Sequence, residues 1–216
     1  MLVGYMGMAL AAKAAAPRVG LGSLMAAAVL FDILAGLFVL LHLESASVPG
    51  DFATRHALVY NFPWSHSLVA AVFWSLVAGF VWTWSGGEGK YLAFAPAVIA
   101  ATAFSHWVLD FIVLPPELPL WGPGSPMVGL GLGRPEALYL SSALAAMGLG
   151  LFLWRRRPEP VQRAVVIGMV LIAAMLSAAD AFRTTPPPDV ATAMAASLLI
   201  LFGAIIAAAL ADREAA

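Results

Sequence analysis

Two polar side chains interrupt an apolar run in the middle of the chain. Residues 104–113 read FSHWVLDFIV, in which His106 and Asp110 stand four positions apart. On a helix this spacing stacks the two side chains on one face, one turn apart. Imidazole nitrogens and carboxylate oxygens bind zinc and also transfer protons in catalysis. The pair therefore predicts either a functional polar site within an apolar helix or a structural hydrogen-bonded pair.

Two residues of neighbouring apolar segments extend this pattern. One is an isolated carboxylate in AVLFDILAG, and the other is a histidine in FPWSHSLV at the start of the next segment. The complete set offers two nitrogen and two oxygen ligands, which suit a divalent metal such as zinc: Asp32, His66, His106 and Asp110. A metal would also neutralise carboxylates that are otherwise buried and unpaired. We predict a metal site, with Asp110 also acting as a catalytic carboxylate.

Each residue also has an ordinary structural interpretation. Asp32 can be protonated, or hydrogen-bonded to a serine or histidine of another helix. His66 can be a half-solvated residue at a helix start, because Ser65 and Ser67 follow Pro63 and fit such a start, with Ser65 near the cap. The same helix start would also help to bind an anion such as phosphate. The four residues taken together favour a real polar site.

The composition predicts the elements that must position these residues. Of 216 residues, 62% are hydrophobic and only 11% are charged, with a mean hydropathy of +0.92. A soluble domain carries about 25% charged residues. Cysteine is absent, which excludes disulfides and thiolate metal sites. The chain is therefore expected to be an all-α, polytopic transmembrane helix bundle in contact with the lipid bilayer.

Apolar blocks of about twenty residues have the length that crosses roughly 30 Å of hydrocarbon. Six of them predict spanning helices: 20–41, 64–84, 91–114, 135–154, 162–182 and 190–211. The stretch 2–16 predicts a shorter helix, because at about 1.5 Å per residue it reaches only about 22 Å. It is either a short span or a re-entrant helix, which gives six or seven helices in total.

Lysine and arginine placement predicts the orientation. With the RRRPEP loop (155–160) in the cytoplasm, eight basic residues fall inside: Lys13, Arg18, Lys90, Arg155, Arg156, Arg157, Arg163 and Arg213. Three fall outside: Arg55, Arg134 and Arg183. All four histidines then lie in the outer half or the outer loops, so the polar site is predicted to face the outer side.

Three other features have ordinary explanations. Asp180 and Arg183 could line the same cavity, but a surface ion pair is favoured. The glycine-rich stretch VGLGLG (128–133) follows no predicted strand, so it does not indicate a nucleotide-binding loop. The RRRPEP loop indicates topology, and we predict no nucleic-acid partner.

Several blocks in order carry a resemblance to a bacterial family. They are VGYMGMALAAKAAAPRVGLGSL, FDIL, WSHSLV, SHWVLD and PELPL followed by VGLGLG. Together they resemble the membrane-bound metal-dependent hydrolases, also described as inner-membrane-associated hydrolases or as a domain of unknown function. The family is distantly similar to zinc-dependent phospholipases C. The resemblance implies a bacterial inner-membrane location and the four metal-binding positions given above.

The likeness covers roughly residues 1–155, so we expect a hydrolase-like helical domain there and two additional helices of the same bundle at 156–216. Two positions depart from the family pattern. Relatives usually carry histidine where this chain has Tyr5, and often histidine where it has Leu114. Four ligands remain, enough for one zinc ion. Either Tyr5 is a hydrogen-bonding or acidic catalytic group of a mononuclear site, or the chain kept the fold and lost turnover.

Three functions follow as hypotheses. The first is a metal-dependent hydrolase acting at the outer face on a phosphoester or lipid-like substrate. The second is a catalytically degenerate relative that serves as a structural or assembly subunit, with a membrane-protein partner or as a homo-oligomer. The third is a proton-coupled transporter. It ranks last, because the polar groups stop in the outer half and the chain has no internal repeat.

Overall fold

Helices form most of residues 1–85 and 94–213, which the computed structural model describes. They are α1 (Leu2–Ala15), α2 (Leu21–Ala28), α3 (Leu30–Leu40), α4 (Phe52–Arg55), α5 (Leu68–Trp84), α6 (Ala95–Val113), α7 (Arg134–Arg156), α8 (Pro160–Ala181) and α9 (Val190–Arg213). Two short antiparallel strand pairs accompany them: β1 (Ser45–Ser47) with β2 (Val59–Asn61), and β3 (Leu118–Pro119) with β4 (Met127–Val128).

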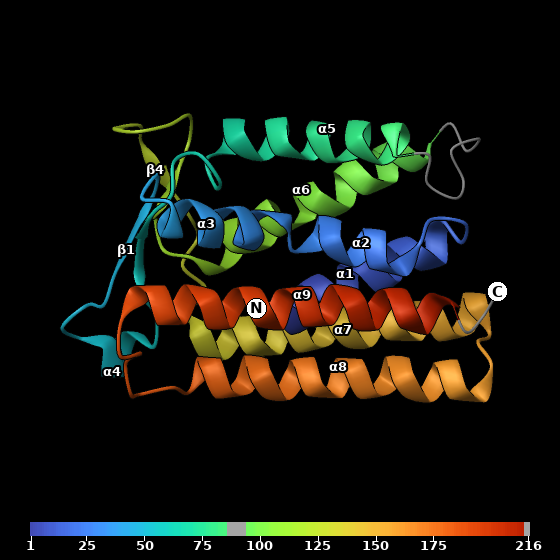
Figure 1. Cartoon of the computed structure of the whole chain (residues 1–216). Helices are drawn as coiled ribbons and strands as arrows, with labels where there is room; N and C mark the ends of the chain where they lie inside the picture. Colours follow the sequence, from blue (N-terminus) through green and yellow to red (C-terminus); the bar gives the residue numbers. More distant parts are fainter. Residues whose placement is uncertain (86–93, 214–216) are drawn as a thin grey trace.

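The long helices run side by side in layers (Figure 1). Helices α5 and α6 pack together on one side, α2 and α3 lie in the middle, and α7, α8 and α9 lie on the other side. Helix α1 is central, because it contacts α2, α6, α7 and α8. The strand pairs and α4 gather at one end of the bundle, opposite the C-terminus.

Four helices, α6 to α9, are long and apolar enough to cross a membrane. The bent pair α2–α3 would make a fifth span if it is counted as one, and α1 and α5 are shorter apolar helices. The prediction of a polytopic helical bundle, and hence of an integral membrane protein, is therefore confirmed in outline. Six complete spans stay a prediction for the described residues.

The predicted span 20–41 is broken. Helices α2 and α3 meet at Val29 with a bend of 55°. The carbonyl of Ala28 at the end of α2 contacts Nδ1 of the His106 ring at 2.8 Å. The last carbonyls of a helix lack partners within it, and a side chain inserted at such a point is a known cause of kinks. His106 lies 78 residues from Ala28 in the chain, so the local sequence pattern could not indicate the break in the helix.

The predicted span 64–84 begins later, at Leu68. Ser67 is the helix cap, because its Oγ accepts a hydrogen bond from Ala70 N at 3.1 Å. Of the two serines that fit the helix start, Ser67 is therefore the cap, and Ser65, two residues before it, contacts Glu44 and His66. The remaining long helices differ less: α7, α8 and α9 each start and end within two residues of the predicted bounds. The predicted start at residue 91 and the side chain of Lys90 lie outside the described residues.

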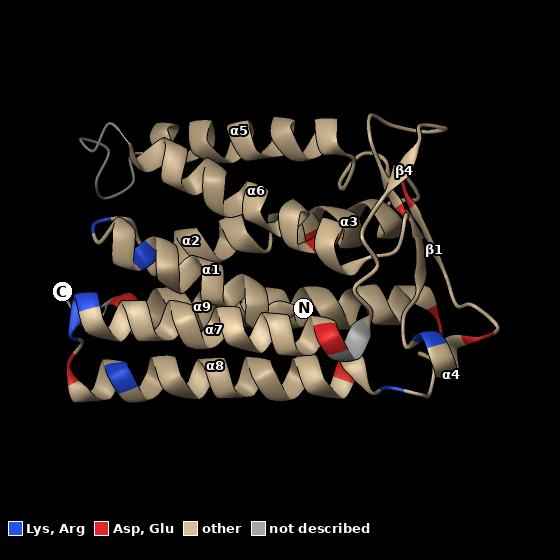
Figure 2. Cartoon of the chain, turned by 180° about the vertical axis from the view of Figure 1, so that it is seen from behind, with Lys and Arg blue, Asp and Glu red and all other residues tan. Residues whose placement is uncertain are grey.

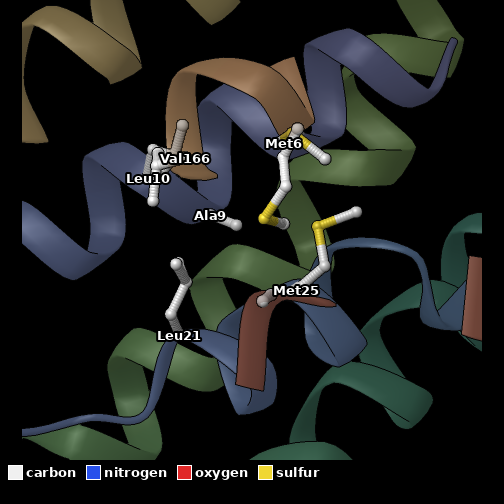
Figure 3. Close-up of a pocket in the computed structure, with 8 residues that line it drawn as sticks. Met6, Ala9, Leu10, Leu21, Met25 and Val166 are labelled. Carbon is white, nitrogen blue, oxygen red and sulfur yellow. The ribbon is translucent and has the colours of Figure 1, made fainter. Parts of the chain in front are cut away.

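Small residues let α1 and α7 approach closely. A Cβ added at Gly7 would lie 2.6 Å from Leu144 O, and one added at Gly148 would overlap Gly7 O. Near this contact, α1, α2, α8 and α9 surround a void of about 10 Å³, with Met6 and Met25 turned into it (Figure 3). A water molecule needs about that much space and polar partners. The void is apolar, so it is a packing gap.

The end of the bundle away from the strands is basic (Figure 2). There Lys13 is buried and pairs with Asp212 at 2.8 Å. Asp212 Oδ2 also accepts a hydrogen bond from Leu21 N at 2.8 Å. This pair therefore joins α1, the start of α2 and the end of α9.

Candidate metal centre

The structure brings the four predicted residues together from α3, the segment before α5, and α6. The Nε2 atom of His66 lies 3.9 Å from Asp32 Oδ1 and 3.5 Å from Asp110 Oδ2. The Nε2 atom of His106 lies 3.6 Å and 3.3 Å from the same two oxygens. One ligand atom each of Asp32, His66 and His106 lies within 4.8 Å of the others, close enough to hold one metal ion.

The cluster is closed on most sides and open on one. The two histidines and Asp110 are buried, whereas the Asp32 side chain is 39% exposed. Asp32 therefore marks the open side of the cluster.

The His106 ring has its two nitrogens in different surroundings. Nδ1 contacts the Ala28 carbonyl, which can only accept, so Nδ1 carries the hydrogen of this bond. In the neutral ring, Nε2 then presents its lone pair to the two aspartates. Among the described residues Nε2 is buried without a hydrogen-bond partner, which is unfavourable for a polar atom. The same arrangement, a ring nitrogen held from behind by a carbonyl, is usual in metal-binding histidines and fits a cation here.

His66 is held in a similar way through a serine. Its Nδ1 lies 2.9 Å from Ser65 Oγ, which in turn lies 2.7 Å from Glu44 Oε2. An ionised carboxylate only accepts, so the Ser65 hydroxyl donates to Glu44 and accepts from His66 Nδ1. His66 Nε2 is then also a lone pair facing the site. Burial raises the pKa of the Glu44 carboxyl, and hydrogen bonds from Ser65 and Trp64 lower it in part.

The sequence analysis did not include Glu44 in the site. A carboxylate in a polar stretch is common, and its contact with Ser65 spans 21 residues. The one indication in the sequence is its place a few residues beyond the span that carries Asp32.

Tyr5 lies in the site as a hydrogen-bonding group, which is one of the alternatives that the sequence left open for it. Its hydroxyl donates to Asp110 Oδ1 at 2.5 Å, and its ring stacks on His106 with centroids 3.9 Å apart. Asp110 thus uses one oxygen for Tyr5 and turns the other towards the histidines. Leu114, the second departure, packs against an apolar cluster that contains Phe31 and Trp107.

The glycine-rich stretch caps the helix that carries His106 and Asp110. The amides of Leu130, Gly131 and Leu132 donate to the carbonyls of Phe111, Leu114 and Ile112, at 2.7, 2.8 and 3.1 Å. These carbonyls lie at the end of α6, where helical partners are lacking. The glycine-rich stretch therefore has a structural role at the end of α6.

Arg183 has contacts of its own at this end. Its Nε donates to Thr185 O at 2.8 Å, and its guanidinium lies 6.0 Å from the Phe52 ring centre. Its pairing with Asp180 stays a prediction. The other two histidines, His42 and His56, occupy turns with φ of 59° and 56°. They are not part of the cluster that could hold a metal among the described residues.

A groove of about 470 Å³ is lined in part by Trp64 and Ser67, on either side of His66 in the chain. It is lined by Phe38, Leu43, Pro63, Trp64, Ser67, Val69, Ala70, Phe73, Trp74 and Trp121. None of these described residues is charged, half of them are aromatic, and Ser67 is the chain neighbour of His66.

A scan against protein-family models gives no match, and searches of curated proteins and of solved structures give none either. The resemblance to the membrane-bound hydrolases therefore rests on the short motifs alone, and the activity that it implies stays a prediction.

Proposed function

We propose that this chain is a membrane-embedded, metal-dependent hydrolase that acts on a lipid-like phosphoester. One observation carries the proposal. Two histidines, each engaged from behind through Nδ1, direct both Nε2 atoms towards two aspartates. A site with two lone-pair nitrogens and two carboxylates is complementary to a cation.

The donor set favours zinc. Imidazole nitrogen suits zinc and other transition metals, whereas calcium and magnesium prefer oxygen ligands. Asp32, His66 and His106 would hold the ion, and three protein ligands leave the open position that catalytic zinc sites keep. A zinc ion supplies positive charge that makes water more acidic and polarises the scissile group.

The chain's own residues have separate roles in this proposal. Asp110 Oδ2, close to both Nε2 atoms, would be either a fourth ligand or the base that accepts a proton from the attacking water. The Tyr5 hydroxyl holds the other oxygen of Asp110 and so orients the carboxylate. The apolar residues behind the histidines exclude water from that side.

The groove beside His66 supports a lipid-like substrate. Its volume falls within the range of about 300–1,000 Å³ that is common for ligand pockets. Its lining is uncharged and aromatic, which suits an aliphatic chain better than a soluble phosphate ester. Ser67, at the groove, adjoins His66, so a chain in the groove would bring its ester towards the cluster.

The proposal includes an orientation. The basic residues gather at the end of the bundle opposite the strands (Figure 2), and basic ends face the cytoplasm. The site end would then face the outer side of a bacterial inner membrane. Helix α5, at 17 residues, is about 25 Å long and would complete six spans together with the bent pair.

Metal analysis of the purified protein tests the proposal. The wild type is expected to contain a single zinc ion per chain, and the Asp32→Ala, His66→Ala and His106→Ala proteins are expected to lose it. His42→Gly is the matched control, since it removes a histidine from a turn whose φ of 59° suits glycine. A metal-free wild type that hydrolyses a chromogenic phosphodiester at the full rate would overturn the proposal.

The two other hypotheses give different results in the same preparations. A structural or assembly subunit would co-purify with a stoichiometric partner and contain no metal. A proton-coupled transporter would show proton or solute flux in vesicles that is lost in Asp32→Asn.

A further inference from the structure

Glu44 is a buried carboxylate outside the four-residue cluster, and the proposed hydrolysis gives it no task. It follows the end of α3, where the amides of Leu43 and Glu44 both donate to Phe38 O, at 2.8 and 3.1 Å. The backbone of Glu44 is therefore anchored to the helix that carries Asp32.

Three donors hold the Glu44 carboxylate on the segment before α5. Oε1 accepts from Trp64 N and Ser65 N, each at 2.8 Å, and Oε2 accepts from Ser65 Oγ at 2.7 Å. A carboxylate with only 6% of its residue exposed is costly to bury unless such donors surround it. The three bonds fix both the turn that precedes His66 and the direction of the Ser65 hydroxyl.

The direction of this hydroxyl determines the tautomer of His66. While Ser65 donates to Glu44, its oxygen can only accept from His66, so the ring hydrogen stays on Nδ1. Without the carboxylate, the hydroxyl is free to donate to Nδ1. The hydrogen of the neutral ring would then move to Nε2, which would point an N–H at the site in place of a lone pair.

We propose that Glu44 is a positioning residue that, through Ser65, keeps the lone pair of His66 Nε2 turned into the cluster. This role of Glu44 sets the tautomer of the His66 ring. It rests on the proposed function only for the identity of the ion that the lone pair would bind. It links α3 and the start of α5, because Glu44 joins the segments that carry Asp32 and His66.

Nitrogen NMR of the metal-free protein, labelled with ¹⁵N-histidine, tests the tautomer directly. The chain has four histidines, so the His66 signals are assigned from their loss in His66→Ala. The wild type is expected to show a protonated Nδ1 and an unprotonated Nε2. In Glu44→Gln and in Ser65→Ala the Nε2-protonated form is expected to appear, whereas Ser65→Thr, which keeps the hydroxyl, retains the wild-type pattern.

Ser65→Ala separates this role from a merely structural one. It removes the hydroxyl but leaves the backbone bonds from Trp64 and Ser65 to Glu44. It also serves if Glu44→Gln fails to fold. Glu117→Gln is the control carboxylate, because Glu117 pairs with Arg55 in the outer loops and not with the site.

Zinc titration of the same proteins gives a second readout. Loss of a residue that supports a metal-binding histidine typically lowers affinity by about 10–100-fold, and we expect that loss for Glu44→Gln and Ser65→Ala. If the wild type binds zinc but both variants keep its tautomer and affinity, the role of Glu44 is overturned and the proposed function stands. If the wild type binds no metal while the tautomer shifts as expected, the role of Glu44 stands and the proposed function fails.

Discussion

Tyr5 contributes to the site through two parts of its side chain. The ring stacks on His106, and the hydroxyl donates to Asp110. A single substitution separates these contacts, because phenylalanine keeps the ring and removes the donor.

In Tyr5→Phe we expect hydrolysis to fall about 10–100-fold, since a hydrogen bond to a charged group contributes about 1.5–3 kcal/mol and 1.36 kcal/mol is tenfold in rate. Zinc content should stay the same, because Tyr5 is not among the residues that would hold the ion. Steady-state rates and metal analysis measure both. The control is Tyr139→Phe, at an exposed position of α7. An unchanged hydrolysis rate in Tyr5→Phe would contradict the orienting role.

The groove can be tested by substitution of a single residue that lines it. Ala70→Trp would place a large ring among its lining residues. We expect the variant to lose activity on a long-chain phosphoester in mixed micelles and to keep activity on a short, soluble phosphodiester. Val72→Trp, at an exposed position of the same helix outside the groove lining, should act as wild type. Equal losses on both substrates would show that the groove does not hold the chain.

Residue type alone identified the reactive members of the cluster but not their supports. Asp32 and His106 are conspicuous because polar residues are rare in apolar runs. Glu44, Ser65 and the Ala28 carbonyl are not, since loop carboxylates, serines and backbone groups occur everywhere. Their relevance depends on contacts across 21 to 78 residues, which no local pattern encodes.

At the scale of elements, hydrophobic length predicted α6 to α9 well, because long apolar runs bounded by proline or glycine have few alternatives. The same reasoning failed at the α2–α3 break and at the start of α5. In both places a polar group intervenes: the His106 ring contacts Ala28, and Glu44 holds Trp64 and Ser65. Tertiary hydrogen bonds thus override the local pattern beside the site.

The close contact of α1 and α7 gives a prediction for stability. Gly148→Ala would force α1 away from α7, because its Cβ would overlap Gly7 O. Such overpacking typically costs about 1–3 kcal/mol, and it would also draw Tyr5 from Asp110. Thermal unfolding in detergent and the hydrolysis rate should both fall. Gly150→Ala, on the same helix with nothing within 4 Å of an added Cβ, should unfold at the wild-type temperature or above it.

The glycine-rich cap of α6 gives a second prediction for an element. An alanine Cβ at position 129 would overlap the carbonyl oxygens of Leu114 and Pro115. We expect Gly129→Ala to detach the cap, lower the unfolding temperature and weaken zinc binding, since α6 carries two residues of the cluster. Gly50→Ala, in a loop with open space around it, is the control. Unchanged zinc affinity in Gly129→Ala would mean that the cap does not position the site.

At the scale of the whole molecule, the two ends differ in charge and in structure. One end collects lysines and arginines, and the other holds the strand pairs and α4 (Figure 2). The charges of the loops predicted this separation. The Lys and Arg bias is a sum over many residues, so it changes little when the bounds of single helices are wrong.

Site-specific labelling tests the orientation, and the absence of cysteine makes it simple. Ala53→Cys lies at an exposed position of α4, and Glu159→Cys lies at an exposed position between α7 and α8. In intact bacterial cells an impermeant thiol reagent should modify only the Ala53→Cys protein. After permeabilisation of the cells it should modify both proteins. The reverse order would place the site in the cytoplasm.

Tyr5 is synthesised well before α7, but its helix is fixed by packing on α7, which begins at Arg134. At about 5–20 residues per second, a ribosome needs roughly 10 s to proceed from α1 to α7. During this interval α1 has no partner for its glycine face, and Asp110 has no hydroxyl beside it. In the proposed enzyme, the contact between Tyr5 and Asp110 would therefore be completed only after α7 has arrived, and full activity would follow that step.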